Sequence, residues 1–446
     1  MTWHRGPWMI LLGLTIACGD DGAPGTGGST GEDGTDTEMA EGTTASPTGG
    51  ATELATGSSG EAESSSGTGG LPDYSDSPCW GEASSTLVYN GVTHNTDQVP
   101  ATCRAEGDRV LLYVADELWE STVDQAAVNG LMHRLELLTP EGSVDPGQGV
   151  VPNDEMVFGA LSEAQFPEGK LAIFVVDTSG GGDGYLCGWC SYPQLHLDGT
   201  ILQPLDGDYG VSIAAHETFH VIHQAYDGNE SQWVDESLAE AAMTANGYFT
   251  DTDWLQSFLD QPDQNWGPGG PGLGEFNYGA ALLWGTYLWE RGSIPLMMAI
   301  TTEPSDGWTG IDAALDAVGD DRDAWDLYLD MIVATYLDDP ALGYGFTSFD
   351  FPAVSTEGDL LVGATEMGTL APYGIDYFPL GDTGELSVGL SSLGPEPVVG
   401  QVVVVSGGAA QVQPLGVATP VSVAPGDSAF VALTARDSAS YELSLD

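Results

Sequence analysis

Basic residues are scarce in this chain of 446 residues, which has 8 Lys and Arg residues against 67 Asp and Glu residues and a formal net charge of −59. A surface of this sign repels nucleic acid phosphates and anionic lipid headgroups. We therefore expect no nucleic acid partner and no electrostatic attachment to a membrane. An acidic surface suits solubility, salt tolerance or loose calcium binding, and composition does not separate these three.

Long apolar segments are also lacking, apart from a stretch at residues 8–16 that follows a short polar start. The stretch is too short to span a bilayer as a mature helix but is typical of an export signal. It ends in LTIAC at residues 14–18, which resembles a bacterial lipoprotein cleavage box, although Thr15 stands where Leu is usual. We expect an exported protein, either lipidated at Cys18 and held at the cell envelope as an outer membrane lipoprotein, or cleaved by ordinary signal peptidase and extracellular. Any contact with a membrane would be made through that anchor alone.

Cysteine is rare too, with five residues in the chain. Without Cys18, four remain: Cys79, Cys103, Cys187 and Cys190. An even number in an exported chain predicts two disulfides with three connectivities, of which Cys79–Cys103 and Cys187–Cys190 is the most economical. The second pair is a C-x-x-C, which also admits a redox centre, but no thioredoxin-like strand-to-helix context surrounds it and a local staple is favoured. A zinc knuckle is not expected, because there is no second C-x-x-C.

Composition divides the chain into segments. Residues 19–72 are almost wholly Gly, Ser, Thr, Ala and acidic residues, which predicts a disordered spacer. Residues 73–370 have the composition of a globular domain, and residues 371–446 alternate short Val/Leu-rich runs with Gly/Pro/Asp turns, which is typical of a β-sandwich module. We expect an α+β fold, with a mixed sheet over one central helix, then a mainly helical lobe, then the β-sandwich.

Apolar spacing predicts the individual elements. Buried strands are expected at residues 109–115 and 170–177, with a shorter strand-like segment through Leu186 and Trp189. Helices are expected at residues 123–138, 209–226, 233–248, 278–290, 311–318 and 324–337. Strands of the last segment are expected at residues 398–405, 421–423 and 429–433.

The most specific motif is HETFH at residues 216–220, an H-E-x-x-H on an expected helix. His216 and His220 are four residues apart and so lie on one helical face, where both imidazoles can bind one ion. Glu217 lies beside that face, where it can act as a base on a metal-bound water. The motif therefore predicts a catalytic zinc site.

A catalytic zinc ion needs a third protein ligand and one position open to water. Glu236, sixteen residues after His220, would complete a His/His/Glu set. Glu240 lies one turn further along the second helix, where it would orient a ligand histidine from behind. Glu240 is also the competing candidate for the third ligand.

HETFH followed by WVDESLAE at residues 233–240 resembles the gluzincin metallopeptidases, and is most similar to their hyicolysin-like and aminopeptidase-N-like branches. The resemblance covers about residues 73–337. Ser237 stands where a Gly is common, and Glu240 where thermolysin-like members have Asp, but neither change removes a ligand. The resemblance implies a zincin-like fold and zinc-dependent peptide hydrolysis.

FNYGAALLW at residues 276–284 resembles the segment that follows the third ligand in hyicolysin-like proteins. This resemblance implies that Tyr278 donates a hydrogen bond to the oxyanion formed during hydrolysis. The alternative is that Tyr278 packs at the start of a helix. His223 is a second oxyanion candidate, although a half-exposed structural histidine is the favoured interpretation.

The remaining acidic and histidine residues carry weaker signals. The acidic loops considered as calcium sites have no EF-hand spacing, so solvated loop acids are the favoured interpretation. These loops contain Asp177 with Asp183, and Asp320 with Asp321 and Asp323. His94, His133 and His196 have no partners in the local sequence and are expected to be structural.

The sequence thus predicts an exported, monomeric zinc metallopeptidase that acts on protein or peptide substrates. Glu217 would be the general base, and His216, His220 and Glu236 would hold a single zinc ion. A rival hypothesis is a surface binding protein built on a catalytically inactive zincin scaffold. An acidic structural lipoprotein with an accidental motif is a weaker rival.

Overall fold

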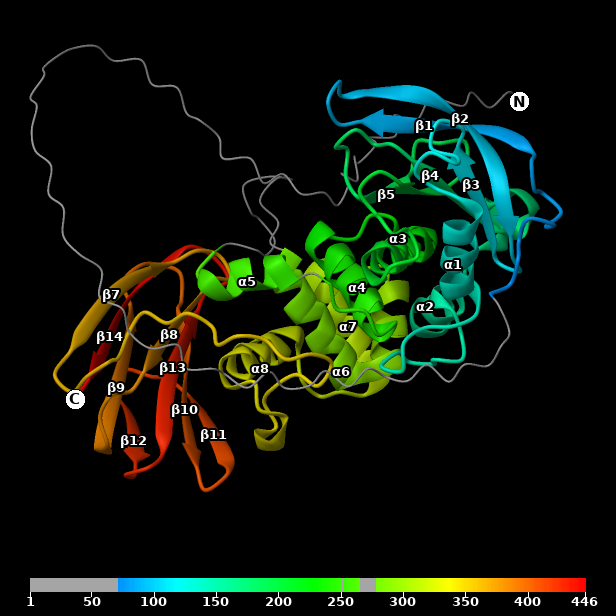
Figure 1. The fold of residues 1–446 in the computed structure, drawn as a ribbon. Coiled ribbons are helices and arrows are strands. Elements are labelled where there is room, and N and C mark those ends of the chain that lie inside the picture. Colours follow the sequence, from blue (N-terminus) through cyan, green and yellow to red (C-terminus); the bar gives the residue numbers. More distant parts are fainter. Residues whose placement is uncertain (1–70, 251, 265–277) are drawn as a thin grey trace, which may run out of the picture. The chain divides into compact units, whose positions relative to one another are not determined.

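The computed structural model describes residues 71–250, 252–264 and 278–446 (Figure 1). The expected export signal, Cys18 and the spacer up to residue 70 lie outside the described residues, as do Phe276 and Asn277. Within the described ranges, no helix combines the length and apolar character needed to span a bilayer.

The first part of the described chain forms a six-stranded mixed sheet of spatial order β1-β2-β3-β4-β6-β5. The β3–β4 and β4–β6 pairs are parallel, whereas the β1–β2, β2–β3 and β5–β6 pairs are antiparallel. Every residue of β4 is buried, as expected for a strand covered on both faces. The strands are β1 (Ala83–Asn90), β2 (Asn95–Glu106), β3 (Val110–Ala115), β4 (Leu171–Val176), β5 (Gly184–Cys187) and β6 (Gln194–Asp198).

The sheet curls, so that β1 reaches the far strands β5 and β6. The Thr86 hydroxyl of β1 donates to Gln194 Oε1 of β6 at 2.5 Å. The Tyr89 amide of β1 donates to the Tyr185 hydroxyl of β5 at 2.9 Å. These hydrogen bonds join strands that lie at opposite ends of the sheet order, and they enclose a small polar cluster between β1 and the β5–β6 pair.

Helices follow the sheet strands and then dominate the middle of the chain (Figure 1). Helix α3, which carries the H-E-x-x-H motif, packs against β5 and β6 on one side and against α4 on another. The α-helices are α1 (Gln125–Glu136), α2 (Val150–Phe158), α3 (Asp208–Asp227), α4 (Gln232–Ala245), α5 (Thr252–Asp260), α6 (Tyr278–Thr302), α7 (Gly307–Val318) and α8 (Ala324–Leu337). Short 3₁₀ helices are η1 (Glu163–Gln165), η2 (Pro167–Gly169) and η3 (Pro340–Leu342).

Helix α4 is held between α3 and α6 by close backbone packing. A Cβ atom at Gly285 of α6 would lie 1.8 Å from the Ser237 carbonyl oxygen of α4, so only glycine permits this approach. Helix α6 is kinked at Ser293, two residues before Pro295, and continues past the expected end at residue 290. The position of α4, and of the acidic residues on it, therefore depends on contacts with both neighbouring helices.

The last part of the described chain is all β, with two four-stranded sheets of order β11-β10-β13-β8 and β12-β9-β14-β7. Buried side chains of both sheets form one apolar cluster, including Val388, Val402, Val431 and Leu443. The strands are β7 (Thr365–Leu370), β8 (Ile375–Pro379), β9 (Gly384–Ser392), β10 (Val399–Ser406), β11 (Ala409–Pro414), β12 (Thr419–Val423), β13 (Ser428–Thr434) and β14 (Ala439–Leu445). The expected α+β composition with an all-β C-terminal part is confirmed.

Among the described residues, Cys79 is bonded to Cys103 and Cys187 to Cys190 in two disulfides. The first connects the segment before β1 to β2. The second closes the turn that follows β5. Both sulfur pairs belong to the sheet part of the chain, which contains the strands nearest to α3.

Candidate metal centre

Helices α3 and α4 bring His216, His220 and Glu236 together. One ligand atom from each residue lies within 4.8 Å of the others, and all three residues are buried. The two histidines are one helical turn apart, with ring centroids separated by 4.9 Å, as their i, i+4 spacing requires. The glutamate comes from the second helix, so the group exists only because α4 docks on α3.

The distances within this group fit a tetrahedral zinc ion. His216 Nε2 lies 3.2 Å from Glu236 Oε2, and His220 Nε2 lies 3.7 Å from the same oxygen. Ligands bound to zinc at ordinary distances of 2.0–2.2 Å would lie about 3.4 Å apart at the corners of a tetrahedron. Burial by itself would raise the pKa of Glu236, but its hydrogen bonds with His216 and His220 outweigh burial and lower the pKa to about 2. The donor set is thus two imidazoles and one carboxylate anion, which zinc accepts.

Asp235 lies behind two of the histidines. Its Oδ2 is 3.0 Å from His220 Nδ1, and its Oδ1 is 2.6 Å from His223 Nδ1. Burial would raise the pKa of Asp235, but the charges and hydrogen bonds of His220 and His223 outweigh it, and the pKa is lowered. A carboxylate on the outer nitrogen fixes the orientation of a ligand imidazole and increases its basicity. Asp235 was not predicted as a site residue, because its only signal in the sequence is its place next to Glu236.

Glu240 contacts the other ligand histidine from behind. Its Oε1 lies 3.4 Å from His216 Nδ1, whereas Glu236 lies on the Nε2 side of the same ring. Burial raises the pKa of Glu240, although contact with His216 opposes the rise. Glu240 and Glu236 thus contact opposite nitrogens of the His216 ring, and the orienting role of Glu240 stays a prediction.

Glu217 is buried at 1% exposure between α3 and β5. A Cβ atom at Gly184 of β5 would lie 2.6 Å from an Ile213 methyl carbon and 3.1 Å from Glu217 Cγ, so the glycine leaves room for both side chains. Burial raises the pKa of Glu217, and the nearby charges of Glu236 and Asp235 add to the rise while His220 and His216 oppose it. A carboxylate with a raised pKa is a stronger base than an ordinary glutamate.

Tyr278 and His223, the two oxyanion candidates, are both near the group. The Tyr278 ring centroid lies 6.5 Å from that of His216 and 5.8 Å from that of Trp254. His223 is 1% exposed and hydrogen-bonded to Asp235, so it is more buried than the half-exposed histidine that we expected. Its place beside Asp235 indicates that it supports that carboxylate.

His196 and four acids of the candidate calcium loops have partners within the protein. His196 is fully buried, and burial lowers its pKa to about 3. Asp177 accepts a hydrogen bond from the Ser179 amide, and the Tyr209 hydroxyl donates to Asp183. Asp320 forms an ion pair with Arg322, and the Asp323 carboxylate caps α8 by accepting from the Asp326 amide. In the part of the chain that the structure describes, the converging groups of three metal-capable side chains are His216/His220/Glu236 and Cys187/Cys190/His196.

Comparison with known proteins gives no family for this chain: no family model and no curated protein matches it. Among solved structures, the Yersinia pseudotuberculosis-derived mitogen is 19% identical, with a TM-score of 0.16 over 18% of this chain and 80% of the mitogen chain. The pre-peptidase C-terminal domain of collagenase from Bacillus anthracis is 11% identical, with a TM-score of 0.17 over 21% of this chain and 100% of that domain. TM-scores this low support no inference about this chain.

Proposed function

We propose that this protein is a zinc-dependent peptidase with a zincin-like catalytic part. The observation that carries the proposal is the convergence of His216, His220 and Glu236 on one point, with Glu217 buried directly beside His216. Two imidazoles and one carboxylate leave a fourth position for water, which is the arrangement of a catalytic rather than a structural zinc site. Glu240 and Asp235 behind the rings add the outer contacts that such sites require.

Bound zinc would supply Lewis-acid polarisation of a water molecule and of the substrate carbonyl. The Glu217 carboxylate accepts a proton from the water as its oxygen bonds to the carbonyl carbon. Glu217 then gives that proton to the amide nitrogen, and the carbon–nitrogen bond breaks to release an amine and a carboxylic acid. Its raised pKa suits both steps, since the group must first take a proton and then return it. In this proposal the Tyr278 hydroxyl donates to the oxyanion.

The test compares the wild-type chain with Glu217→Gln. We expect both to bind one zinc ion per chain, measured by elemental analysis after dialysis. Loss of the general base should lower the hydrolysis rate by about a hundredfold to ten-thousandfold on casein or a fluorogenic peptide library. The matched control is Glu117→Gln, which neutralises an exposed acid on the sheet part and should keep full activity.

Chelation should abolish wild-type hydrolysis, and added zinc should restore it. Full activity in the Glu217→Gln variant would overturn the assignment of the base. A wild-type chain that binds zinc but cleaves no peptide would favour the inactive binding scaffold. Absence of stoichiometric zinc would instead indicate that the motif is accidental.

A further inference from the structure

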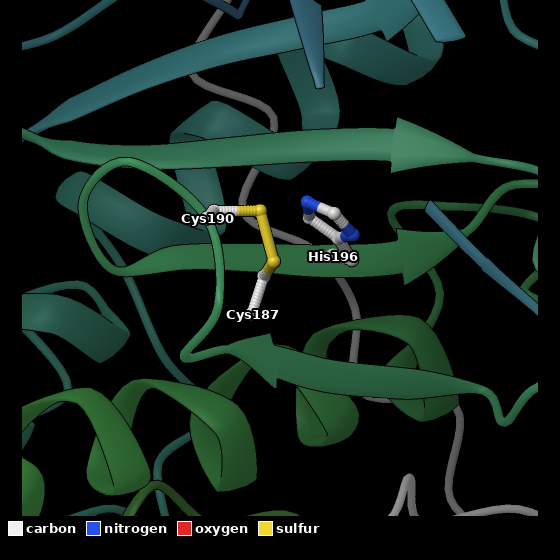
Figure 2. A group of neighbouring side chains, drawn as sticks. All are labelled: Cys187, Cys190 and His196. Carbon is white, nitrogen blue, oxygen red and sulfur yellow. A yellow bond between two sulfur atoms is a disulfide. The ribbon is translucent and has the colours of Figure 1, made fainter. Parts of the chain in front are cut away.

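A second group of metal-capable side chains lies on the β5–β6 pair (Figure 2). Cys187 is the last residue of β5 and lies opposite Gln194 of β6, and His196 follows two residues later on the same strand face. Cys190 returns across the turn to form the disulfide with Cys187. One ligand atom from each of Cys187, Cys190 and His196 lies within 4.8 Å of the others.

The surroundings of this group are polar and enclosed. Cys187 and His196 are 0% exposed, and Thr86 of β1 covers them at 4% exposure. Thr86 Oγ1 is 2.9 Å from His196 Nε2 and 3.8 Å from Cys190 Sγ, so it lies next to both. Cys187 Sγ and Cys190 Sγ lie 3.9 Å and 3.8 Å from the Leu87 carbonyl oxygen, which can accept a hydrogen bond from a thiol.

The hydrogen bonds around His196 define its proton position in the disulfide state. Tyr185 accepts from the Tyr89 amide, and its hydroxyl lies 2.7 Å from His196 Nδ1. Thr86 donates to Gln194 Oε1, so its oxygen must act as acceptor for His196 Nε2–H. Nδ1 then accepts from the Tyr185 hydroxyl. The imidazole is neutral, and moving one proton from Nε2 to Nδ1 would leave a lone pair on Nε2 that can bind a metal ion.

We propose that Cys187, Cys190 and His196 form a second metal site, for a thiophilic divalent cation such as zinc, which opens when the Cys187–Cys190 disulfide is reduced. A dithiol reductant supplies two electrons and two protons and becomes a disulfide, while the sulfur–sulfur bond of the protein breaks to give two thiols. Both thiols lose their protons when the cation binds. His196 binds through Nε2, and its Nδ1–H then donates to the Tyr185 oxygen.

Charge and spacing favour a dication over an empty dithiolate. Two thiolates and a divalent cation form a neutral cluster, whereas two buried thiolates alone would be strongly destabilising. The C-x-x-C spacing is the one that zinc sites use, and zinc–sulfur bonds of 2.3 Å would hold the sulfurs about 3.8 Å apart. Cys187 and Cys190 are bonded to each other in the disulfide, so the two sulfurs move apart once that bond is reduced. Cys190 lies in a turn and is only partly buried, which allows this movement.

Cobalt provides a probe that distinguishes this site from the His/His/Glu group. The full chain is reduced with dithiothreitol, desalted under argon and titrated with Co²⁺, and thiolate-to-cobalt charge transfer is followed in the near ultraviolet. We expect this band to saturate at one equivalent in the reduced chain and to be absent in the oxidised chain. The His216, His220 and Glu236 group offers no thiolate, so failure of the proposed peptidase function would leave this result unchanged.

Variants identify the ligands. The double variant Cys187→Ser/Cys190→Ser keeps Cys79 and Cys103, so its spectrum measures any cobalt held by the other pair, and we expect no charge-transfer band. His196→Gln should weaken cobalt binding at least tenfold, whereas the exposed-histidine control His94→Gln should leave it unchanged.

Because His196 is fully buried, circular dichroism checks that His196→Gln folds. If it does not fold, Cys190→Ala, at a partly buried turn position, provides the equivalent test and should also weaken binding at least tenfold. The proposal is overturned if the reduced wild-type chain shows no charge-transfer band. It is equally overturned if the folded ligand variants keep the band with unchanged affinity.

Discussion

Asp235 Oδ2 lies 3.0 Å from His220 Nδ1. The next residue, Glu236, lies 3.7 Å from Nε2 of the same ring. Asp235 and Glu236, consecutive residues of α4, thus contact the two different nitrogens of one imidazole, and Glu236 lies on the side of the proposed metal. The orientation of His220 is therefore set from α4 as well as from its own helix.

This arrangement predicts that Asp235→Asn weakens zinc binding. An amide is uncharged and provides one acceptor oxygen instead of two, so it cannot hold His220 and His223 in the same way. We expect a 10- to 100-fold loss of zinc affinity, on the order found when outer partners of metal ligands are removed. Competition with a chromogenic chelator measures it. Asp316→Asn, at an exposed position on α7, is the control and should bind zinc normally.

Glu236 and Glu240 should differ in their effects on the metal. Glu236→Gln removes the anionic ligand, so we expect loss of stoichiometric zinc after dialysis. Glu240→Gln removes only the contact behind His216 and should keep the zinc ion at about 10-fold lower affinity. Elemental analysis of the two dialysed variants, measured side by side, shows which of them loses its zinc ion. The reverse order would make Glu240 the third ligand and would contradict the present assignment.

Ionisation of the buried Asp376 carboxyl should lower the free energy of unfolding of the chain as the pH rises. Burial raises the pKa of Asp376 to about 6, with Glu357 and Asp263 adding to the rise and the Tyr441 hydroxyl opposing it. Because the folded-state pKa lies above the unfolded value, the folded state favours the protonated acid. The cost of ionisation is thus absent below about pH 4 and complete above about pH 6, and amounts to about 3 kcal/mol.

Asp376→Asn should remove this cost, since an amide stays neutral and still accepts from Tyr441. Urea unfolding at several pH values should show the variant gaining free energy of unfolding relative to wild type between pH 4 and 6. The exposed position Asp359 offers a control, and Asp359→Asn should follow the wild-type curve. A difference between Asp376→Asn and wild type that does not change with pH would refute the prediction.

The two disulfides should contribute unequally to stability. Cys79 and Cys103 are 24 positions apart, so their bond restricts the unfolded chain far more than the Cys187–Cys190 bond, which spans 3. Replacing Cys79 and Cys103 by serine should lower the free energy of unfolding by about 3 kcal/mol. Replacing Cys187 and Cys190 should cost clearly less, and equal losses in denaturant melts would count against this explanation.

Local sequence was sufficient for the elements with strong apolar periodicity. Helix α8 has the expected bounds of residues 324–337, and α3 extends only one residue beyond the expected helix at each end. Strands β1 and β2 were not predicted, because they lie at the curled end of the sheet, are partly exposed and contain few apolar residues in a row. Helix α2 was also missed, since it is short and contains Pro152 in its first turn.

The candidate metal centre likewise contains residues that the sequence predicts together and residues that it does not. His216, Glu217 and His220 share one helix, so their spacing alone places them together. The contact of Asp235 with His220 depends on how α4 docks against α3, and nothing in the local spacing indicates it. The polar cluster around His196 was not predicted either, because Thr86 belongs to β1 and contacts His196 only where the sheet curls.

Because Asp235, Glu236 and Glu240 all belong to α4, the site depends on the rotational phase of that helix against α3. Inserting one residue between Glu236 and Glu240 would rotate Glu240 by about 100° and move it away from His216. By contrast, the short connection at residues 228–231 supplies no ligand and ends before the helix begins. The order of the acids along α4 is therefore a criterion for the same site in related chains.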